Sequence, residues 1–104
     1  MDISNPDYGL SNQELVRKLG MNFKNYRLAR RLSQKEAAAL AGVSEVTLRQ
    51  FENGRKYNIS MAGFIGLMRA VGMLDRIGEL LPEIPISPYV LAKLEARKPK
   101  RIRK

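Results

Sequence analysis

Four serines, each just before a stretch with helical periodicity, constrain the fold of this chain more than any other feature. They are Ser11, Ser33, Ser44 and Ser60. A serine at a helix start accepts a hydrogen bond from the backbone of the first turn. The first two are followed three residues later by Glu14 and Glu36, the spacing of a capping box. Helix stops follow at Gly42, Gly54 and Gly72. Helix starts and stops at this spacing predict a succession of helices, most of them short, and an all-α fold.

These signals divide residues 12–81 into five predicted helices. Apolar residues recur with helical period through Leu19 and Phe23 and predict the first helix over 12–31. Gly20 is a candidate break within it, because glycine costs about 1 kcal/mol relative to alanine inside a helix. The other helices are predicted from Ser33 to Gly42, over 45–53, from Ser60 to Gly72 and over 74–81.

The C-terminal part is predicted to have a different organisation. Closely spaced prolines, Pro82, Pro85 and Pro88, predict an extended connector over 82–88, because proline cannot continue a helix. A last short helix is expected over 89–97, followed by a basic tail. A chain of 104 residues is long enough for one domain with a core. We therefore divide it into an N-terminal segment, 1–11, a helical domain, 12–81, and a C-terminal extension, 82–104.

The charge of the chain favours a polyanionic partner. Its formal net charge is +9, and binding to phosphates releases condensed counterions and so gains affinity. Most of this charge lies in the tail, in Arg97, Lys98, Lys100, Arg101, Arg103 and Lys104. Nucleic acid is therefore the first candidate, with a folded part that is only mildly basic. Charge alone leaves RNA open, although no aromatic-rich sheet motif is present.

Composition also argues against several other functions. The chain has no cysteine and no histidine, so we expect no disulfide, no thiol chemistry and none of the usual zinc ligands. No spacing assembles a metal site, a phosphate loop or a nucleophile with a base, and we expect no cofactor, no catalytic residue and no enzyme. The first residues lack the pattern of a signal peptide, and no apolar run approaches the roughly 20 residues that span a bilayer. We expect a cytoplasmic protein without a membrane partner.

Residues 32–54 carry the functional signal. A short helix, a tight turn through Gly42 and Val43, and a second capped helix predict two helices that cross steeply, which is how a helix is presented to a DNA major groove. Ala38 is small where the two helices should approach closely, and Leu48 is predicted to point inward.

The other face of that second helix is left for a ligand. Its predicted outward residues are Glu45, Val46, Arg49 and Gln50. The Gln50 amide can pair with adenine through two hydrogen bonds, and Arg49 can bind guanine or phosphate. A good base contact of this kind is worth about 1 to 3 kcal/mol of discrimination.

From Leu19 to about Leu81 the chain resembles the lambdoid phage repressor and Cro type of helix-turn-helix domain, the Xre family. The resemblance rests on the Leu-Ser-Gln opening at 32–34, the Ala-Gly-Val-Ser turn at 41–44, the Glu-Asn-Gly ending at 52–54 and the helix start at Ser60, all in family order. It implies a five-helix, lambda-repressor-like domain that binds double-stranded operator DNA.

The resemblance also implies roles for individual residues. Gln34 would hold a phosphate, and the loop residues Asn53, Arg55 and Lys56 would grip the DNA backbone. Bases would be read by Glu45, Val46, Thr47, Arg49 and Gln50. A buried ion pair would join Arg27 of the first helix to Glu52 of the third.

Three residues depart from the family pattern. Arg31 replaces a glycine or asparagine, and Ala37 replaces a commoner leucine; we expect both changes to concern packing only. Glu45 stands where many relatives carry a polar or basic residue. It would either accept a hydrogen bond from a cytosine amino group or repel phosphate and so reject wrong sites.

The remaining apolar residues suggest an interface. A stripe formed by Phe64, Leu67, Met68 and Val71 is predicted to be core. Part of the next set, Leu74, Ile77, Leu80 and Leu81, must face outward. Because two operator half-sites require two recognition helices about 34 Å apart, we assign part of this excess to a symmetric homodimer interface. Ile84 and Ile86 are weaker candidates for an intermolecular strand, and the basic tail is a candidate DNA-contacting arm.

Two functions follow. The first is a sequence-specific transcriptional repressor that autoregulates its own operon. The second is an antitoxin, because the Leu-Pro-x-x-x-x-Ser-Pro connector at 81–88 and the basic C-terminus are similar to those of HipB-like antitoxins. That resemblance implies a HipA-like serine/threonine kinase toxin as a partner. The two functions are compatible in one protein.

Overall fold

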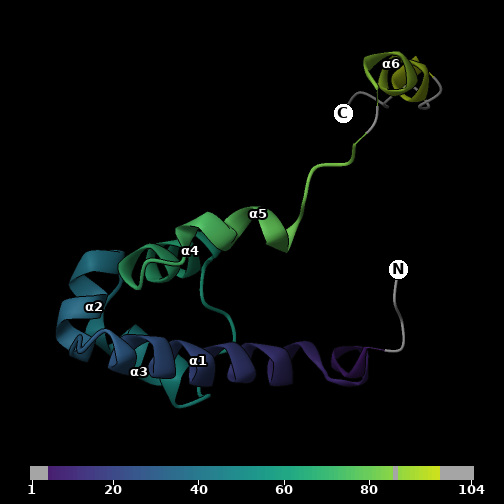
Figure 1. The fold of residues 1–104 in the computed structure, drawn as a ribbon. Coiled ribbons are helices and arrows are strands. Elements are labelled where there is room, and N and C mark those ends of the chain that lie inside the picture. The colour runs from purple at the N-terminus through teal and green to yellow at the C-terminus, as the bar shows by residue number, and fades with distance from the viewer. Residues whose placement is uncertain (1–4, 86, 97–104) are drawn as a thin grey trace, which may run out of the picture.

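A computed structural model describes residues 5–85 and 87–96, and all regular secondary structure in these ranges is helical (Figure 1). The all-α prediction is confirmed. In chain order the elements are a 3₁₀ turn at Pro6–Gly9, α1 at Asn12–Ala29, α2 at Gln34–Ala41, α3 at Glu45–Glu52, α4 at Met61–Ala70, a 3₁₀ turn at Leu74–Arg76, α5 at Ile77–Leu80 and α6 at Pro88–Ala96.

The predicted caps form the starts of α1 to α4. Ser11 and Ser33 build complete capping boxes with Glu14 and Glu36. The Ser60 hydroxyl accepts from the N–H of Gly63 at 2.9 Å. Each of these helices therefore begins where a serine hydroxyl accepts a hydrogen bond from one of the otherwise unpaired N–H groups of the first turn.

Gly20 does not break the first helix, contrary to the sequence-based interpretation. α1 runs unbroken through it and ends at Ala29, two residues earlier than expected. A Cβ atom on Gly20 would lie 2.0 Å from the carbonyl oxygen of Phe51. Glycine is needed here because the backbones of α1 and α3 approach closely, a tertiary contact that outweighs the low helix propensity of glycine.

Arg31 departs from the family pattern through its backbone, and the expectation of a packing effect was wrong. Its φ of 56° is the only positive value at a non-glycine residue in the described part of the chain, and its side chain is exposed. This left-handed conformation is strained for residues with a Cβ. The glycine or asparagine that the pattern favours at this position would adopt it more easily.

The core is formed where α1, α2, α3 and α4 meet. Leu48, Phe51, Leu67 and Val71 are its largest fully buried side chains. The ring of Phe51 packs against Phe23 at 6.2 Å and meets the ring of Phe64 edge-on at 6.3 Å between centroids. The predicted stripe on α4 therefore faces inward, with Phe64 and Met68 half-buried.

Small residues bring α4 against α2. Ala37 and Ala38 of α2 are buried. On α4, a Cβ atom added to Gly66 would lie 2.1 Å from the carbonyl oxygen of Ala41. α2 therefore packs directly against α4 up to the turn that follows it.

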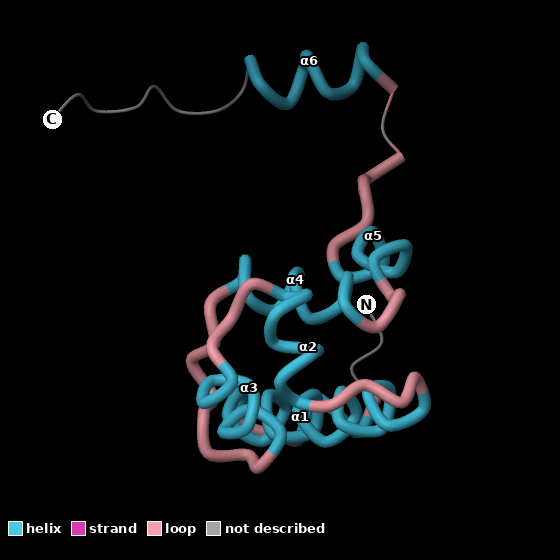
Figure 2. Tube along the Cα trace, turned by 90° about the vertical axis from the view of Figure 1, so that its left-hand side faces the viewer, coloured by secondary structure: helices cyan, strands magenta, loops and turns pink. Residues whose placement is uncertain are grey.

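The segment after α4 differs from the predicted fifth helix over 74–81. It forms the Leu74–Arg76 3₁₀ turn followed by a single turn of α5, and neither start carries a side-chain cap. A helix this short needs tertiary packing, but Leu80 and Leu81 are 54% and 89% exposed. Beyond it the connector leads away to α6, which stands apart from the other helices in both views (Figures 1 and 2).

Candidate nucleic-acid interface

The turn between α2 and α3 is built by three local interactions. Gly42 ends α2 in the left-handed conformation, with φ of 74°. The Ser44 hydroxyl then accepts from the Thr47 N–H at 3.0 Å and donates to Thr47 Oγ1 at 2.9 Å. The predicted turn is therefore present, and Thr47 is engaged in capping α3 and is half-buried.

The two faces of α3 have opposite characters. Leu48 and Phe51 on its inner face are completely buried. The outward residues are Glu45, Val46, Arg49 and Gln50, and all four are exposed. We call these four the outer face of α3. Val46 presents an aliphatic side chain that is 51% exposed, between groups that donate and accept hydrogen bonds.

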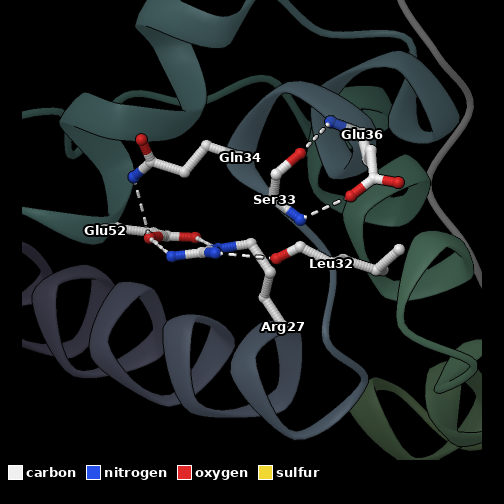
Figure 3. A network of polar contacts seen from close by, with 6 residues as sticks. All are labelled: Arg27, Leu32, Ser33, Gln34, Glu36 and Glu52. Atoms are coloured by element: carbon white, nitrogen blue, oxygen red, sulfur yellow. Dashed lines mark hydrogen bonds and ion pairs between the residues drawn. The ribbon is translucent and has the colours of Figure 1, made fainter.

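Arg27 and Glu52 form a buried ion pair between α1 and α3 (Figure 3). Arg27 Nε and Nη2 donate to the two Glu52 carboxylate oxygens at 2.7 and 2.9 Å, and Nη1 donates to the Leu32 carbonyl at 2.8 Å. Their side chains are only 8% and 0% exposed. The hydrogen bond to the Glu52 carboxylate raises the pKa of Arg27 above its ordinary value.

Gln34 belongs to the same network. Its Nε2 donates to Glu52 Oε1 at 3.1 Å (Figure 3), and the residue is half-buried. The side-chain amide assigned to phosphate is thus held by Glu52 in this structure. Gln34 is also the first residue of α2, and first-turn N–H groups lack intrahelical partners and can bind an anion.

The loop after α3 carries the three predicted backbone-gripping residues. Asn53 caps the C-terminus of α3. The N–H of Arg55 donates to the carbonyl of Gln50 at 2.8 Å, which ties the loop to the outer face of α3. Asn53 and Arg55 are exposed, while Lys56 is half-buried.

Arg17 is a cation at this loop that the sequence interpretation missed. A Cβ atom on Gly54 would lie 2.8 Å from Arg17 Cγ, so the arginine stem passes directly beside the loop. Arg17 precedes Gly20 by three residues on α1, and residues at that spacing share a helix face. That spacing was the available signal, but it became informative only once Gly20 was known to contact α3.

The described residues contain no group of three or more acidic side chains placed to hold a metal ion. Within the same ranges no helix has the length and apolar character needed to cross a membrane. Apart from Glu45 and Val46, the exposed outer face of α3 and the loop residues Asn53 and Arg55 present arginine and amide donors, which match phosphate oxygens and base edges.

A family model for a helix-turn-helix domain matches residues 9–80, well over half of the chain. The comparisons with curated proteins and with solved structures give no significant match. The matched span contains α1 to α5, so the connector and α6 lie beyond it.

Proposed function

Because the chain belongs to the helix-turn-helix domain family, whose fold serves DNA-binding regulators, we propose that it is a sequence-specific transcriptional repressor. It binds a two-fold operator as a homodimer and represses its own operon. The outer face of α3 carries this proposal, because four exposed residues stand on a helix whose other face is fixed in the core.

Base reading is assigned to the outer face of α3. Gln50 offers a donor and an acceptor for adenine, Arg49 offers two donors for guanine, and Val46 offers an apolar contact to the thymine methyl group. Glu45 is the acidic exception, which accepts from cytosine or rejects sites by repelling phosphate. Thr47, which is hydrogen-bonded to the capping residue Ser44, would contact DNA only from the first turn of α3.

Phosphate contacts are assigned to both ends of the motif. Gln34 would contact phosphate from the first turn of α2. Asn53, Arg55 and Lys56 would contact it from the loop after α3. Arg17 adds a fifth position beside that loop. Such contacts fix the register of a protein on the duplex without reading its sequence, so they hold the outer face of α3 in the major groove.

The direct test replaces Arg49 and Gln50 by alanine, one at a time. The probe is a duplex selected from a randomised pool by the unaltered protein. Each variant should lose specific binding by about 5- to 150-fold, since a good base contact is worth about 1 to 3 kcal/mol. Arg69→Ala, which removes an exposed arginine from α4, is the charge-matched control. Full affinity in both α3 variants would refute the assigned reading face.

The basic tail after Ala96 lies outside the described residues. We propose that its cations add phosphate contacts to the complex. Truncation after Ala96 should flatten the dependence of log affinity on log salt while leaving the sequence preference unchanged, because each phosphate contact adds to that slope. An unchanged slope would show that the tail does not contact DNA.

A second candidate function, an antitoxin that neutralises a HipA-like kinase, is favoured by the connector. Leu81 and Ile84 are 89% and 73% exposed on an extended segment, and such a segment can add to the sheet edge of a partner protein. Ile86, the third residue of that idea, is outside the described residues. Purification from the native host should then yield a stoichiometric complex with a kinase, which Leu81→Asp should disrupt. A chain that purifies without a kinase is a stand-alone repressor.

A further inference from the structure

An apolar groove runs between α1 and α4 on the helix-turn-helix domain. Two adjoining hollows of about 150 and 330 Å³ form it. Leu19 of α1 and Phe64 of α4 line both hollows, Tyr26 lines the first, and Leu80 of α5 lines the second. A hollow of roughly 150 Å³ accepts a benzene-sized apolar group, so the groove has room for several aliphatic side chains.

The residues at its rim are exposed although they are apolar. Leu19 and Tyr26 are 43% and 42% exposed, and Met61 is 70% exposed. An apolar surface of this kind on a small domain usually marks an interaction site. The groove is separate from the outer face of α3, whose residues do not line it.

α6 is the complementary element, because its apolar side chains are exposed in the structure. Val90, Leu91 and Leu94 lie along one side of this nine-residue helix, and all three are exposed. An isolated helix shorter than about 12 residues is marginal in water. Packing against an apolar surface would therefore stabilise it.

The connector determines which groove α6 can reach. It leaves α5 at Leu80, which itself lines the groove. Pro82, Pro85 and Pro88 recur every third residue, and proline-rich segments of this kind stay extended at about 3.1 Å per residue. In both views the connector carries α6 away from the other helices of its own chain (Figures 1 and 2). A stiff spacer would hold it there, away from the groove of its own domain.

We propose that α6 of one copy occupies the α1–α4 groove of a second copy, and that the exchange is reciprocal. The contact is then isologous, with each copy giving α6 and receiving it. Every groove contact is formed twice in the dimer, which helps a nine-residue helix approach the roughly 1,600 Å² that a standard interface buries. This exchange requires no DNA, so it can be tested on the protein alone.

Engineered disulfides test the exchange cleanly because the chain has no cysteine. Leu19 lies in the groove and Leu94 on α6, and both are partly exposed, so Leu19→Cys and Leu94→Cys should leave the domain folded. Under mild oxidation the double variant should become a covalent dimer, while each single variant stays monomeric on a denaturing gel. An intrachain disulfide would show that α6 folds back on its own domain. Self-linking of Leu94→Cys would show that α6 pairs with α6. Either result, or no disulfide, overturns the proposal.

The dimerisation equilibrium gives an independent measurement. Leu94→Asp should raise the dissociation constant of the dimer by about tenfold or more, because it places a charge in an apolar groove. Leu40→Asp is the matched control, since Leu40 is 61% exposed on α2 and does not line the groove. A monomeric unaltered protein, or equal effects of the two substitutions in sedimentation, would contradict the exchange.

Discussion

Arg27 of α1 and Glu52 of α3 meet through two parallel hydrogen bonds of 2.7 and 2.9 Å in the interior of the domain. Nη1 of Arg27 also donates to the Leu32 carbonyl. Oε1 of Glu52 also accepts a hydrogen bond from the Gln34 amide. One ion pair therefore links α1, the start of α2 and the end of α3. It fixes the angle at which α3 is presented.

Breaking this pair should be costly. Removing one partner leaves a buried charge without compensation, so Arg27→Met should lower the free energy of unfolding by about 3 to 5 kcal/mol. The double variant Arg27→Met, Glu52→Leu should recover most of the loss, because no unpaired charge remains. Chemical denaturation measures both.

The exposed pair between Lys18 and Asp7, 2.8 Å long with both side chains about half exposed, is the control. Lys18→Met should change stability by less than about 1 kcal/mol, since surface pairs contribute little. Similar losses at the two pairs would mean that burial does not set the value of the Arg27–Glu52 pair.

Arg31→Gly should stabilise the domain by about 0.5 to 1 kcal/mol. A left-handed residue with a Cβ costs roughly 1 to 2 kcal/mol, and the greater freedom of glycine in the unfolded chain returns part of that. Arg31→Ala keeps the Cβ and should give no such gain. The midpoint of urea denaturation distinguishes the two variants, and equal shifts would exclude backbone strain at this position.

Gly20→Ala should destabilise the domain although alanine is the better helix former. The new Cβ would meet the Phe51 carbonyl at 2.0 Å and force α1 away from α3. Gly78→Ala is the matched control, since nothing lies within 4 Å of the added atom in α5, and it should be neutral or mildly stabilising. Thermal unfolding compares the pair; a stable Gly20→Ala protein would mean that α1 and α3 are not in backbone contact.

These residues show how far the sequence could predict the structure. The capping boxes at Ser11 and Ser33, the turn at Gly42 and the stop at Gly72 depend on chemistry within a few residues, and all were predicted correctly. The outward direction of Arg49 and Gln50 followed from helical periodicity alone. Local signals were therefore sufficient to predict which side chains of α3 are exposed.

Other features of the structure depend on packing between helices and could not be predicted from local signals. Propensity made Gly20 a helix break, while its real constraint is the Phe51 carbonyl in another helix. The apolar spacing of Leu74 and Ile77 predicted a full helix, but the segment lacks both a cap and a buried face long enough to support one. The hydrogen bond from Gln34 to Glu52 likewise depends on how α2 and α3 pack against each other.

Acid should weaken the domain partly through its capping boxes. The backbone N–H of Ser33, and then its hydroxyl, lower the pKa of Glu36 from 4.5, and Ser11 does the same for Glu14. Because the folded-state pKa values are the lower ones, this stabilisation is complete above the ordinary value and is lost as the pH falls through the lowered one.

The double variant Glu14→Gln, Glu36→Gln isolates this contribution. Glutamine can still cap through its carbonyl oxygen, but it does not titrate. The unfolding free energy of the double variant should therefore fall less steeply between neutral and acid pH than that of the unaltered protein. Parallel curves would assign the acid sensitivity to other carboxylates.

The central claim, that the outer face of α3 reads base pairs, is tested most directly by one competition measurement. The affinity for a duplex selected from a randomised pool is compared with that for a scrambled duplex of the same length and composition at physiological salt. Specific readers prefer their site by about a thousandfold or more, and we predict a preference of that order with two-fold symmetry in the selected sequence. Equal, weak binding of both duplexes would contradict the account.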